Sequence, residues 1–240
     1  MVAEDSLQYE GGHLLSRFRL LVRRFLAAIG HILGSVVIVL WRRSKQEEYP
    51  VSVHLLVSSS SWHCGLLAAI SLESFCEKNW HFVFHDDGSI SESQRKRIKK
   101  TLPCVEFIPR RTAEERMAEV LKDFPKCLQN RSAHNFFLKI FDFKPFTAKQ
   151  KFIVLDSDVI FFKRPSEIVE WAEGDSGQIY YNKDTQEKYC NPRPELEGVF
   201  DFPIWEKFNS GLVLMQSAAM SLPLAESLFE KFEGRAHHPQ

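Results

Sequence analysis

The sequence has no excess of charge of either sign, because its 240 residues include 31 Lys and Arg and 31 Asp and Glu. A balanced chain has no overall positive field, which argues against nucleic acid as a partner. Cysteine is also scarce. The five cysteines have no C-x-x-C spacing, so neither a disulfide framework nor a zinc site is predicted. We therefore expect a reducing, cytoplasmic setting.

Long hydrophobic runs are missing too, and no apolar stretch is followed by a small-residue cleavage site, so we expect no cleaved secretory signal. Residues 25–41 are apolar but contain a histidine and two glycines, and they fall a little short of the roughly 20 residues of a membrane-spanning helix. Residues 13–29 have helical apolar spacing, with arginines on the opposite side.

These features predict a disordered tail at residues 1–12 and a membrane-associating segment with its linker at residues 13–49. Within that segment, we expect residues 13–41 to lie as a basic helix on an anionic membrane surface, peripheral to the inner face of the membrane. Two alternatives stay open. The same residues suit a single membrane span, and they also suit a helix that packs on the rest of the chain.

From residue 50 to residue 240, apolar runs of strand length alternate with stretches of helical periodicity. Strands are expected at residues 51–57, 81–85, 105–108, 152–155, 178–181 and 212–215. Helices are expected between them, among others at residues 92–100, 112–122, 134–143 and 165–171, the first two opened by the capping boxes Ser91/Gln94 and Thr112/Glu115. This alternation predicts one α/β domain, a mostly parallel doubly wound sheet with helices on both faces.

The most informative stretch is Lys151–Pro165, KFIVLDSDVIFFKRP. Its apolar run predicts a strand buried on both faces, which ends at Asp156-Ser157-Asp158. Two carboxylates one residue apart repel each other unless a cation lies between them. Mg²⁺ and Mn²⁺ prefer such oxygen ligands and take one or two from the protein. Because apolar residues resume at Val159–Phe162, we expect both carboxylates to be held between two buried segments. A simple strand cap is the plainer alternative.

Polar side chains also follow other predicted strands. Ser58 comes after the first strand, and residues 86–89, Asp-Asp-Gly-Ser, come after the second. In a parallel sheet, ligands bind at these carboxyl ends. Further along, Asn209, Ser210 and Gly211 precede the last strand and are expected to form a tight turn.

Two cations and one long loop complete the set of candidates. Lys139, on the helix at residues 134–143, and Arg131 before it are available to a phosphate, unless each forms a surface ion pair. Residues 182–208 are long, without periodicity and rich in proline. Loops of this length in a compact domain are usually functional or disordered. We expect this one to shape a substrate site through its aromatic residues Tyr189, Phe200, Phe202 and Trp205.

From about residue 51 onward, the chain resembles the GT-A-fold glycosyltransferases, nucleotide-diphospho-sugar transferases related to the glycogenin and galactosyltransferase-like group. The resemblance is carried by VHLLVSS in the first strand, HDDGS at the end of the second, IVLDSDVIFFKRP, and FNSGLVLM downstream. The D-x-D and F-N-S-G elements at this separation form a fairly specific pair, whereas either alone is weak.

The resemblance implies roles for the matching positions. Asp156 and Asp158 would hold Mn²⁺ or Mg²⁺ against the diphosphate of a nucleotide sugar, a UDP-sugar in the first place, where the metal neutralises the departing nucleoside diphosphate. The acceptor would be a saccharide, a lipid or a protein. The rest of the nucleotide-sugar site would comprise Ser58, Asp86 and Asp87 near the base and ribose, Lys139 and Ser157 near the phosphates, and Asn209, Ser210 and Gly211 on the sugar side.

One departure from the family pattern concerns the metal. Members of the group usually supply a third ligand, often a histidine, from beyond the F-N-S-G element. Here His237 and His238 are the candidates. Either they serve, or the chain is truncated before its closing segment, or the site is incomplete. An inverting enzyme also needs a carboxylate base near the acceptor hydroxyl. The long loop offers Asp184 and Asp201, with Glu195 and Glu197 as further candidates.

Two other functions fit parts of the sequence. IVLDSDVI also resembles the D-x-D-x-[TV] nucleophile motif of haloacid-dehalogenase-type phosphatases, in which Asp156 would attack phosphorus. Against this, position 160 is Ile and no later acidic pair follows. The other alternative is a non-catalytic, membrane-docked module that binds nucleotide sugars through a degenerate site.

Overall fold

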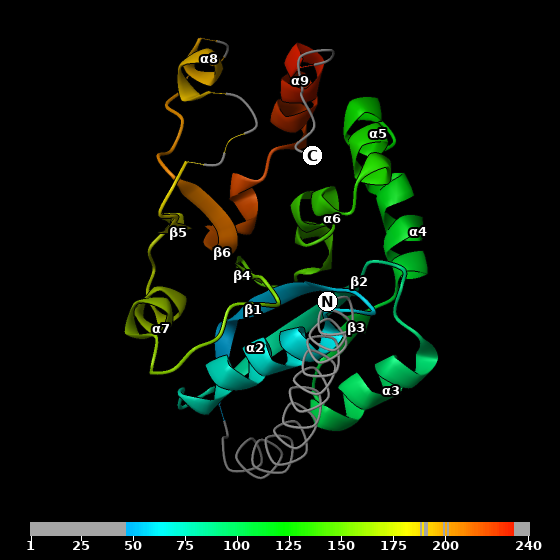
Figure 1. Cartoon of the computed structure of the whole chain (residues 1–240), viewed down its shortest axis with the longest axis vertical. Coiled ribbons are helices and arrows are strands. Elements are labelled where there is room, and N and C mark those ends of the chain that lie inside the picture. The colour runs from blue at the N-terminus through cyan, green and yellow to red at the C-terminus, as the bar shows by residue number, and fades with distance from the viewer. Residues whose placement is uncertain (1–46, 188, 190–191, 199, 201, 233–240) are drawn as a thin grey trace, which may run out of the picture.

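A computed structural model describes residues 47–187, 189, 192–198, 200 and 202–232 of the chain (Figure 1). The tail and the membrane helix predicted within residues 1–46 lie outside the described residues, as do the candidate side chains Asp201, His237 and His238. Within these described ranges, no helix has both the length and the apolar character needed to cross a membrane.

Six strands of the described chain form one sheet in the order β3-β2-β1-β4-β6-β5. The strands are β1 (Glu48–Val57), β2 (Asn79–Asp86), β3 (Glu106–Ile108), β4 (Lys151–Leu155), β5 (Tyr180–Lys183) and β6 (Phe208–Gln216). The first four pair in parallel, whereas β6 runs antiparallel to both β4 and β5. The predicted mostly parallel α/β sheet is thus confirmed.

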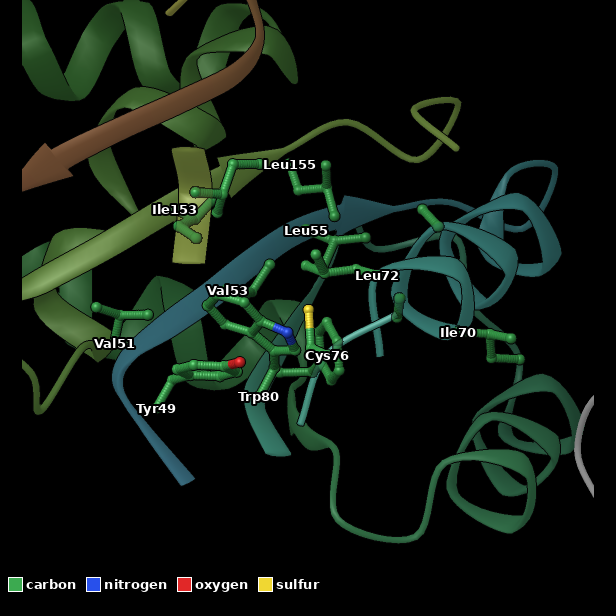
Figure 2. Close-up of a cluster of buried hydrophobic side chains, with 14 of the residues drawn as sticks. Tyr49, Val51, Val53, Leu55, Ile70, Leu72, Cys76, Trp80, Ile153 and Leu155 are labelled. Carbon is green, nitrogen blue, oxygen red and sulfur yellow. The ribbon is translucent and has the colours of Figure 1, made fainter. Parts of the chain in front are cut away.

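The central strand β1 is buried on both faces. Its odd-numbered side chains from Tyr49 to Val57 are at most 1% exposed, and Ser52 and His54 on the other face are fully covered. On the first face, the rings of Tyr49 and Trp80 stack with centroids 4.1 Å apart, beside Val53 (Figure 2). A strand covered on both sides has a mostly apolar sequence, which explains why residues 51–57 could be predicted as a strand.

Helices cover both faces of the sheet, as the sequence predicts. They are α2 (Trp62–Ser74), α3 (Glu92–Thr101), α4 (Arg110–Val120), α5 (Pro125–Ala133), α6 (Phe136–Phe141), α7 (Ser166–Glu173), α8 (Arg193–Glu197) and α9 (Leu222–Phe232), with short 3-10 turns η1 (Lys144–Phe146) and η2 (Ser217–Ala219). Apolar side chains of α2, α3 and α7 pack on the face that carries Val53 and Leu55. Phe143, Phe146 and Ala113 of α4 pack on the other face.

A second group of helices stands beyond the sheet, where α4, α5, α6 and α9 pack around Met117, Cys127 and Phe141 (Figure 1). The Glu226 carboxylate of α9 accepts the backbone N–H groups of Lys126 and Cys127 at 2.8 Å each. These donors belong to the first turn of α5, whose N–H groups have no partner within the helix. This cluster therefore supports α6, the helix that carries Lys139.

Two helix predictions need correction. The capping box at Thr112 and Glu115 does not form, because α4 already begins at Arg110 with Pro109 as its N-cap residue. The helix expected at residues 134–143 is also shorter than predicted, because α6 spans Phe136–Phe141; its buried side chains are Leu138 and Phe141, whereas Phe136 is exposed. By contrast, the capping box of Ser91 and Gln94 is present and opens α3.

Two further corrections concern the candidate site. Residues 209–211 do not form a tight turn, because they lie within β6 and pair along it with β5 and β4. The stretch Val159–Phe162 is not a second buried segment. Val159 and Phe161 pack on the core, but Ile160 is exposed and the Phe162 side chain is 86% exposed. The D-x-D motif is thus followed by a partly exposed segment and not by a second buried one.

Candidate active site

Strand ends from four strands bring the candidate residues to one edge of the sheet. β1, β2 and β4 are parallel, so Val57, Asp86 and Leu155 all end at this edge. Because β6 runs in the opposite direction, its beginning lies at the same edge. Leu155 pairs with Leu212, and the Asp156 N–H donates to the Gly211 carbonyl at 2.7 Å. The sheet itself therefore joins the D-x-D motif to the F-N-S-G element.

The Asp156 side chain lies between the sheet and helix α6. The Lys139 ammonium of α6 donates a hydrogen bond to Asp156 Oδ1. The two side chains are mostly covered, with 17% of Lys139 and 28% of Asp156 exposed. The Lys139 ammonium also lies 5.5 Å from the centroid of the Phe136 ring, within the range of a cation–π contact. A positive charge thus neutralises the carboxylate that the sequence assigns to a metal.

Gly211 permits this arrangement because a larger residue would crowd it. A Cβ atom at position 211 would lie 2.9 Å from Asn209 Oδ1 and 3.4 Å from Asp156 Oδ2. The Asn209 carboxamide is held at both ends, since Oδ1 accepts the Gly211 N–H at 2.7 Å and Nδ2 donates to Asp184 Oδ2 at 3.3 Å. Asp184, Asn209 and Asp156 therefore belong to one connected set. Ser210, between them, lies on the other face of β6.

Asp158 has different surroundings from Asp156. Residues 156–159 form a turn closed by a 3.2 Å bond from the Val159 N–H to the Asp156 carbonyl, and the Asp158 side chain is exposed. Ser157 faces α2, where its Cβ lies 3.7 Å from the Cβ position of Gly65. The same Gly65 position would be only 2.8 Å from Val57 Cγ1. Close packing of α2 against β1 therefore fixes the base of the turn.

The carboxylates of Asp156 and Asp158 suit a hard divalent ion, although they are only two protein ligands. Two carboxylates one residue apart meet the usual need of Mg²⁺ or Mn²⁺ for one or two protein oxygens, with water and phosphate supplying the others. Across the described ranges, no three His, Cys, Asp or Glu side chains are grouped to hold an ion. A third protein ligand, as the resemblance implies, is therefore not found among the residues described.

The loops after β1 and β2 form one polar rim at the same edge of the sheet as the turn at residues 156–159. The Asp87 N–H donates to the Val57 carbonyl at 3.1 Å, and the Ser59 N–H donates to Ser89 Oγ at 2.8 Å. Asp86 Oδ1 accepts the Gly88 N–H at 2.8 Å, so this carboxylate shapes its own loop. The Ser58 hydroxyl shares hydrogen bonds with the serines that follow it.

Three candidate residues lie away from the group gathered around Asp156 at the edge of the sheet. Arg131 is buried and makes two hydrogen bonds to the Asp142 carboxylate, at 2.6 and 2.8 Å, so it supports the fold and is not available to a phosphate. Glu195 and Glu197 lie on α8, where Glu197 pairs with Arg193 at 2.7 Å.

One side chain at the site was not predicted. Asn135 Nδ2 donates to Asp87 Oδ2 at 3.5 Å, and this contact joins the start of α6 to the rim. Its sequence signal is weak, since Asn135 is simply the polar residue that precedes a helix.

Comparison with known proteins supports this architecture. Searches against protein-family models and against curated protein sequences give no match. Among solved structures, mouse xyloside xylosyltransferase 1 superimposes with a TM-score of 0.54 at 15% identity, over 80% of this chain and 78% of that one.

Two further structures match less closely. The bifunctional glycosyltransferase WbbM gives a TM-score of 0.40 at 13% identity over 75% of this chain, which spans a third (33%) of the WbbM chain. Core-mannan synthase A from Aspergillus fumigatus, in its Mn/GDP form, gives 0.45 at 10% identity over 79% of this chain and 64% of that one. The similarity to the xylosyltransferase, together with the strand order and the central D-x-D turn, shows that the chain has the GT-A fold.

Proposed function

We propose that this chain is a metal-dependent glycosyltransferase, which moves a sugar from a nucleotide-diphosphate sugar, a UDP-sugar in the first place, to a saccharide, lipid or protein acceptor. The observation that carries the proposal is the position of Asp156. It follows the buried strand β4 at the carboxyl edge of a GT-A sheet, against Gly211 of β6 and within hydrogen-bond reach of Lys139. Ligands of open α/β sheets bind at this edge.

Asp156 and Asp158 would hold Mn²⁺ or Mg²⁺, which neutralises negative charge on a departing nucleoside diphosphate. In this proposal, Lys139 alternates between two anions. Its ammonium neutralises Asp156 when no ion is bound, and it turns to a donor phosphate when one is. An ammonium on a four-carbon stem suits this exchange, because it is a flexible point charge with three donors.

Other residues of the edge would bind and orient the donor. The rim formed by Ser58, Asp86 and Asp87 would contact the base and ribose, since it closes the ends of the first two strands. Asn209 and Gly211 would line the sugar side, where a glycine lets a ligand approach the backbone. Asp184 Oδ2 accepts a hydrogen bond from Asn209 Nδ2 at 3.3 Å, which supports a role for Asp184 in orienting the sugar-side amide or in accepting a proton.

We also propose that residues 13–41 hold the enzyme at an anionic membrane surface. The proposal is motivated by the basic and apolar spacing of this segment. Flotation of the full chain with phosphatidylserine vesicles is expected, and deletion of residues 13–41 should abolish it. Equal flotation of both forms would refute this part without affecting the rest.

The test of the enzymatic proposal measures hydrolysis and transfer of a panel of UDP-sugars, including UDP-xylose. Hydrolysis of at least one donor in Mn²⁺ is expected, with loss in chelator and a fall of about 100-fold or more in Asp156→Ala. Asp175→Ala, at an exposed acidic position outside the site, is the matched control and should behave as wild type. Metal-independent turnover, or an active Asp156→Ala variant, would refute the proposal.

A further inference from the structure

Three aromatic side chains form a connected stack beside the candidate site. The rings of Tyr181 and Trp205 are nearly parallel, with centroids 5.1 Å apart and an angle of 8° between their planes. Phe208 lies against both, at 5.1 Å from Tyr181 and 5.8 Å from Trp205. Tyr181 and Phe208 are partly buried on the core of the sheet, and Trp205 is the outermost of the three, 43% exposed. We call Tyr181, Trp205 and Phe208 the aromatic stack.

The aromatic stack lies at the same edge of the sheet as Asp156. Lys183 of β5 pairs with Phe208 of β6, and Asn182 pairs with Asn209. β5 therefore ends where β6 begins, which is the edge that Asp156 occupies through its bond to Gly211. Because Trp205 stands three residues before Phe208, it reaches this edge from the long loop.

Hydrogen bonds to two backbone carbonyls, those of Trp205 and Lys207, hold this part of the loop in place. The Tyr189 hydroxyl donates to the Trp205 carbonyl, and the Asp184 N–H donates to the Lys207 carbonyl at 2.8 Å. Lys207 has a φ of 52°, in the left-handed region that non-glycine residues rarely adopt. A backbone conformation of this kind persists only when its surroundings enforce it, and here it occurs two residues after Trp205, where the long loop enters β6.

The neighbours of Trp205 restrict the kinds of ligand that its exposed ring can bind. One face of Trp205 is covered by Tyr181, so its exposed area belongs to the other face and the edge. Polar groups lie at the same ends of β5 and β6: the Asp184 carboxylate, the Asn209 carboxamide, and the ion pair between Lys183 and Glu206. A flat aromatic surface with planar hydrogen-bonding groups beside it matches a pyranose or furanose ring. The C–H bonds of such a ring lie on the negative aromatic face, while its hydroxyls reach amides and carboxylates.

We propose that the aromatic stack, with Asp184 and Asn209 at its border, is a binding site for the sugar ring of a saccharide acceptor. The inference rests on the proposed function and narrows it, because a saccharide is preferred to a lipid chain or a bare peptide as the group next to the donor sugar. A sugar stacked on Trp205 would direct its hydroxyls toward the strand ends, which also carry the D-x-D turn.

The test measures saccharide binding by the whole chain without nucleotide or metal, so that its outcome is independent of donor binding. The probe is a panel of oligosaccharides that covers common pentoses, hexoses and N-acetylhexosamines in α and β linkage, read by saturation-transfer NMR. Binding of at least one class is expected, and Trp205→Ala should weaken it by roughly tenfold. Metal-dependent binding of UDP should stay unchanged in this variant.

Tyr180→Ala is the matched control. Tyr180 is on the same strand and is 46% exposed, but its side chain lies on the opposite face from Tyr181. The Tyr180→Ala variant should bind the saccharide with the affinity of the wild-type chain. If Trp205→Ala does not fold, quenching of tryptophan fluorescence by the saccharide in the wild-type chain provides a second readout. The proposal is overturned if no oligosaccharide binds, or if Trp205→Ala binds as wild type.

Discussion

At the residue scale, the two acidic side chains of the D-x-D motif differ in what surrounds them. Asp156 is mostly covered and paired with Lys139, whereas Asp158 is exposed on the turn. The spacing of the motif was visible in the sequence, but this asymmetry was not. Lys139 is 17 residues from Asp156, and its approach depends on how α6 rests on α5 and α9. Sequence alone identified Lys139 as a cation without identifying its partner.

Replacement of Lys139 should show that the ammonium and a metal ion share Asp156. In Lys139→Met the half-buried carboxylate loses its partner, so we expect the metal-free protein to lose about 1 kcal/mol of unfolding free energy. Mn²⁺ should then raise the melting temperature more in the variant than in wild type, since the ion no longer displaces an ammonium. Differential scanning calorimetry measures both effects.

The control is Lys149→Met, which removes an ammonium from a more exposed ion pair with Glu48 at the opposite end of β1. This variant should respond to Mn²⁺ as wild type does. An equal Mn²⁺ response in Lys139→Met and wild type would contradict the shared use of Asp156.

Gly211→Ala tests the close approach of β6 to Asp156. The added Cβ would lie 2.9 Å from Asn209 Oδ1 and 3.4 Å from Asp156 Oδ2, so the Asn209 carboxamide must move. We expect a loss of about 1–2 kcal/mol in urea unfolding, together with weaker Mn²⁺ binding by titration calorimetry. Gly198→Ala is the control, because the nearest described atoms to a Cβ there, the carbonyl oxygens of Glu195 and Pro194, lie 3.5 Å away. Equal effects at the two positions would count against a crowded site.

At the element scale, buried strands were predicted well and helix starts less well. β1, β2 and β4 have apolar sequences because both of their faces are covered, and the expected ranges agree with the structure to within a few residues. The start of α4 was misplaced because a T-x-x-E pattern inside a helix looks like a capping box. Residues 209–211 suggested a turn by composition, but pairing with two neighbouring strands keeps them extended.

The strands also contain a buried polar chain that links β1 to β2. His54 Nδ1 and His85 Nε2 are 2.9 Å apart, and Ser52 Oγ joins His54 Nε2, at 2.8 Å, to Thr147 Oγ1, at 2.7 Å. Burial lowers the pKa of His85 to about 3, and burial together with the neighbouring histidine lowers the pKa of His54 well below its usual range. Both histidines are therefore neutral in the folded protein near pH 7.

These shifts predict a loss of stability in mild acid. The folded pKa values of both histidines lie below the unfolded value of about 6.5. Their full contribution to the free energy of unfolding is therefore present above pH 6.5. This contribution is lost as the pH falls toward 3, because the unfolded chain takes up protons first. The slope is about 1.4 kcal/mol per pH unit for each histidine. In His85→Gln, urea unfolding should show a shallower decrease between pH 7 and pH 5, while the exposed His134→Gln should leave the slope unchanged. Equal slopes in all three proteins would disprove the assignment.

At the scale of the whole molecule, the alternation of strands and helices predicted an α/β sheet, but it did not predict the order of the strands. The antiparallel direction of β6 is invisible in its apolar sequence, and it is what brings Asn209 and Gly211 to Asp156. The aromatic residues of the long loop were predicted to shape a substrate site. Of these residues, Trp205 stacks on Tyr181, and this contact depends on the pairing of β5 with β6, which local sequence patterns do not predict.

The proposed function requires that Asp156 and Asp158 hold a divalent ion to which the nucleotide binds. Titration calorimetry of UDP into the full chain, with Mn²⁺ and with chelator, measures this binding. We expect binding in Mn²⁺, none in chelator, and loss of binding in both Asp156→Asn and Asp158→Asn, whereas Asp175→Asn should bind as wild type. Metal-independent binding of UDP, or unchanged binding in Asp156→Asn, would contradict it.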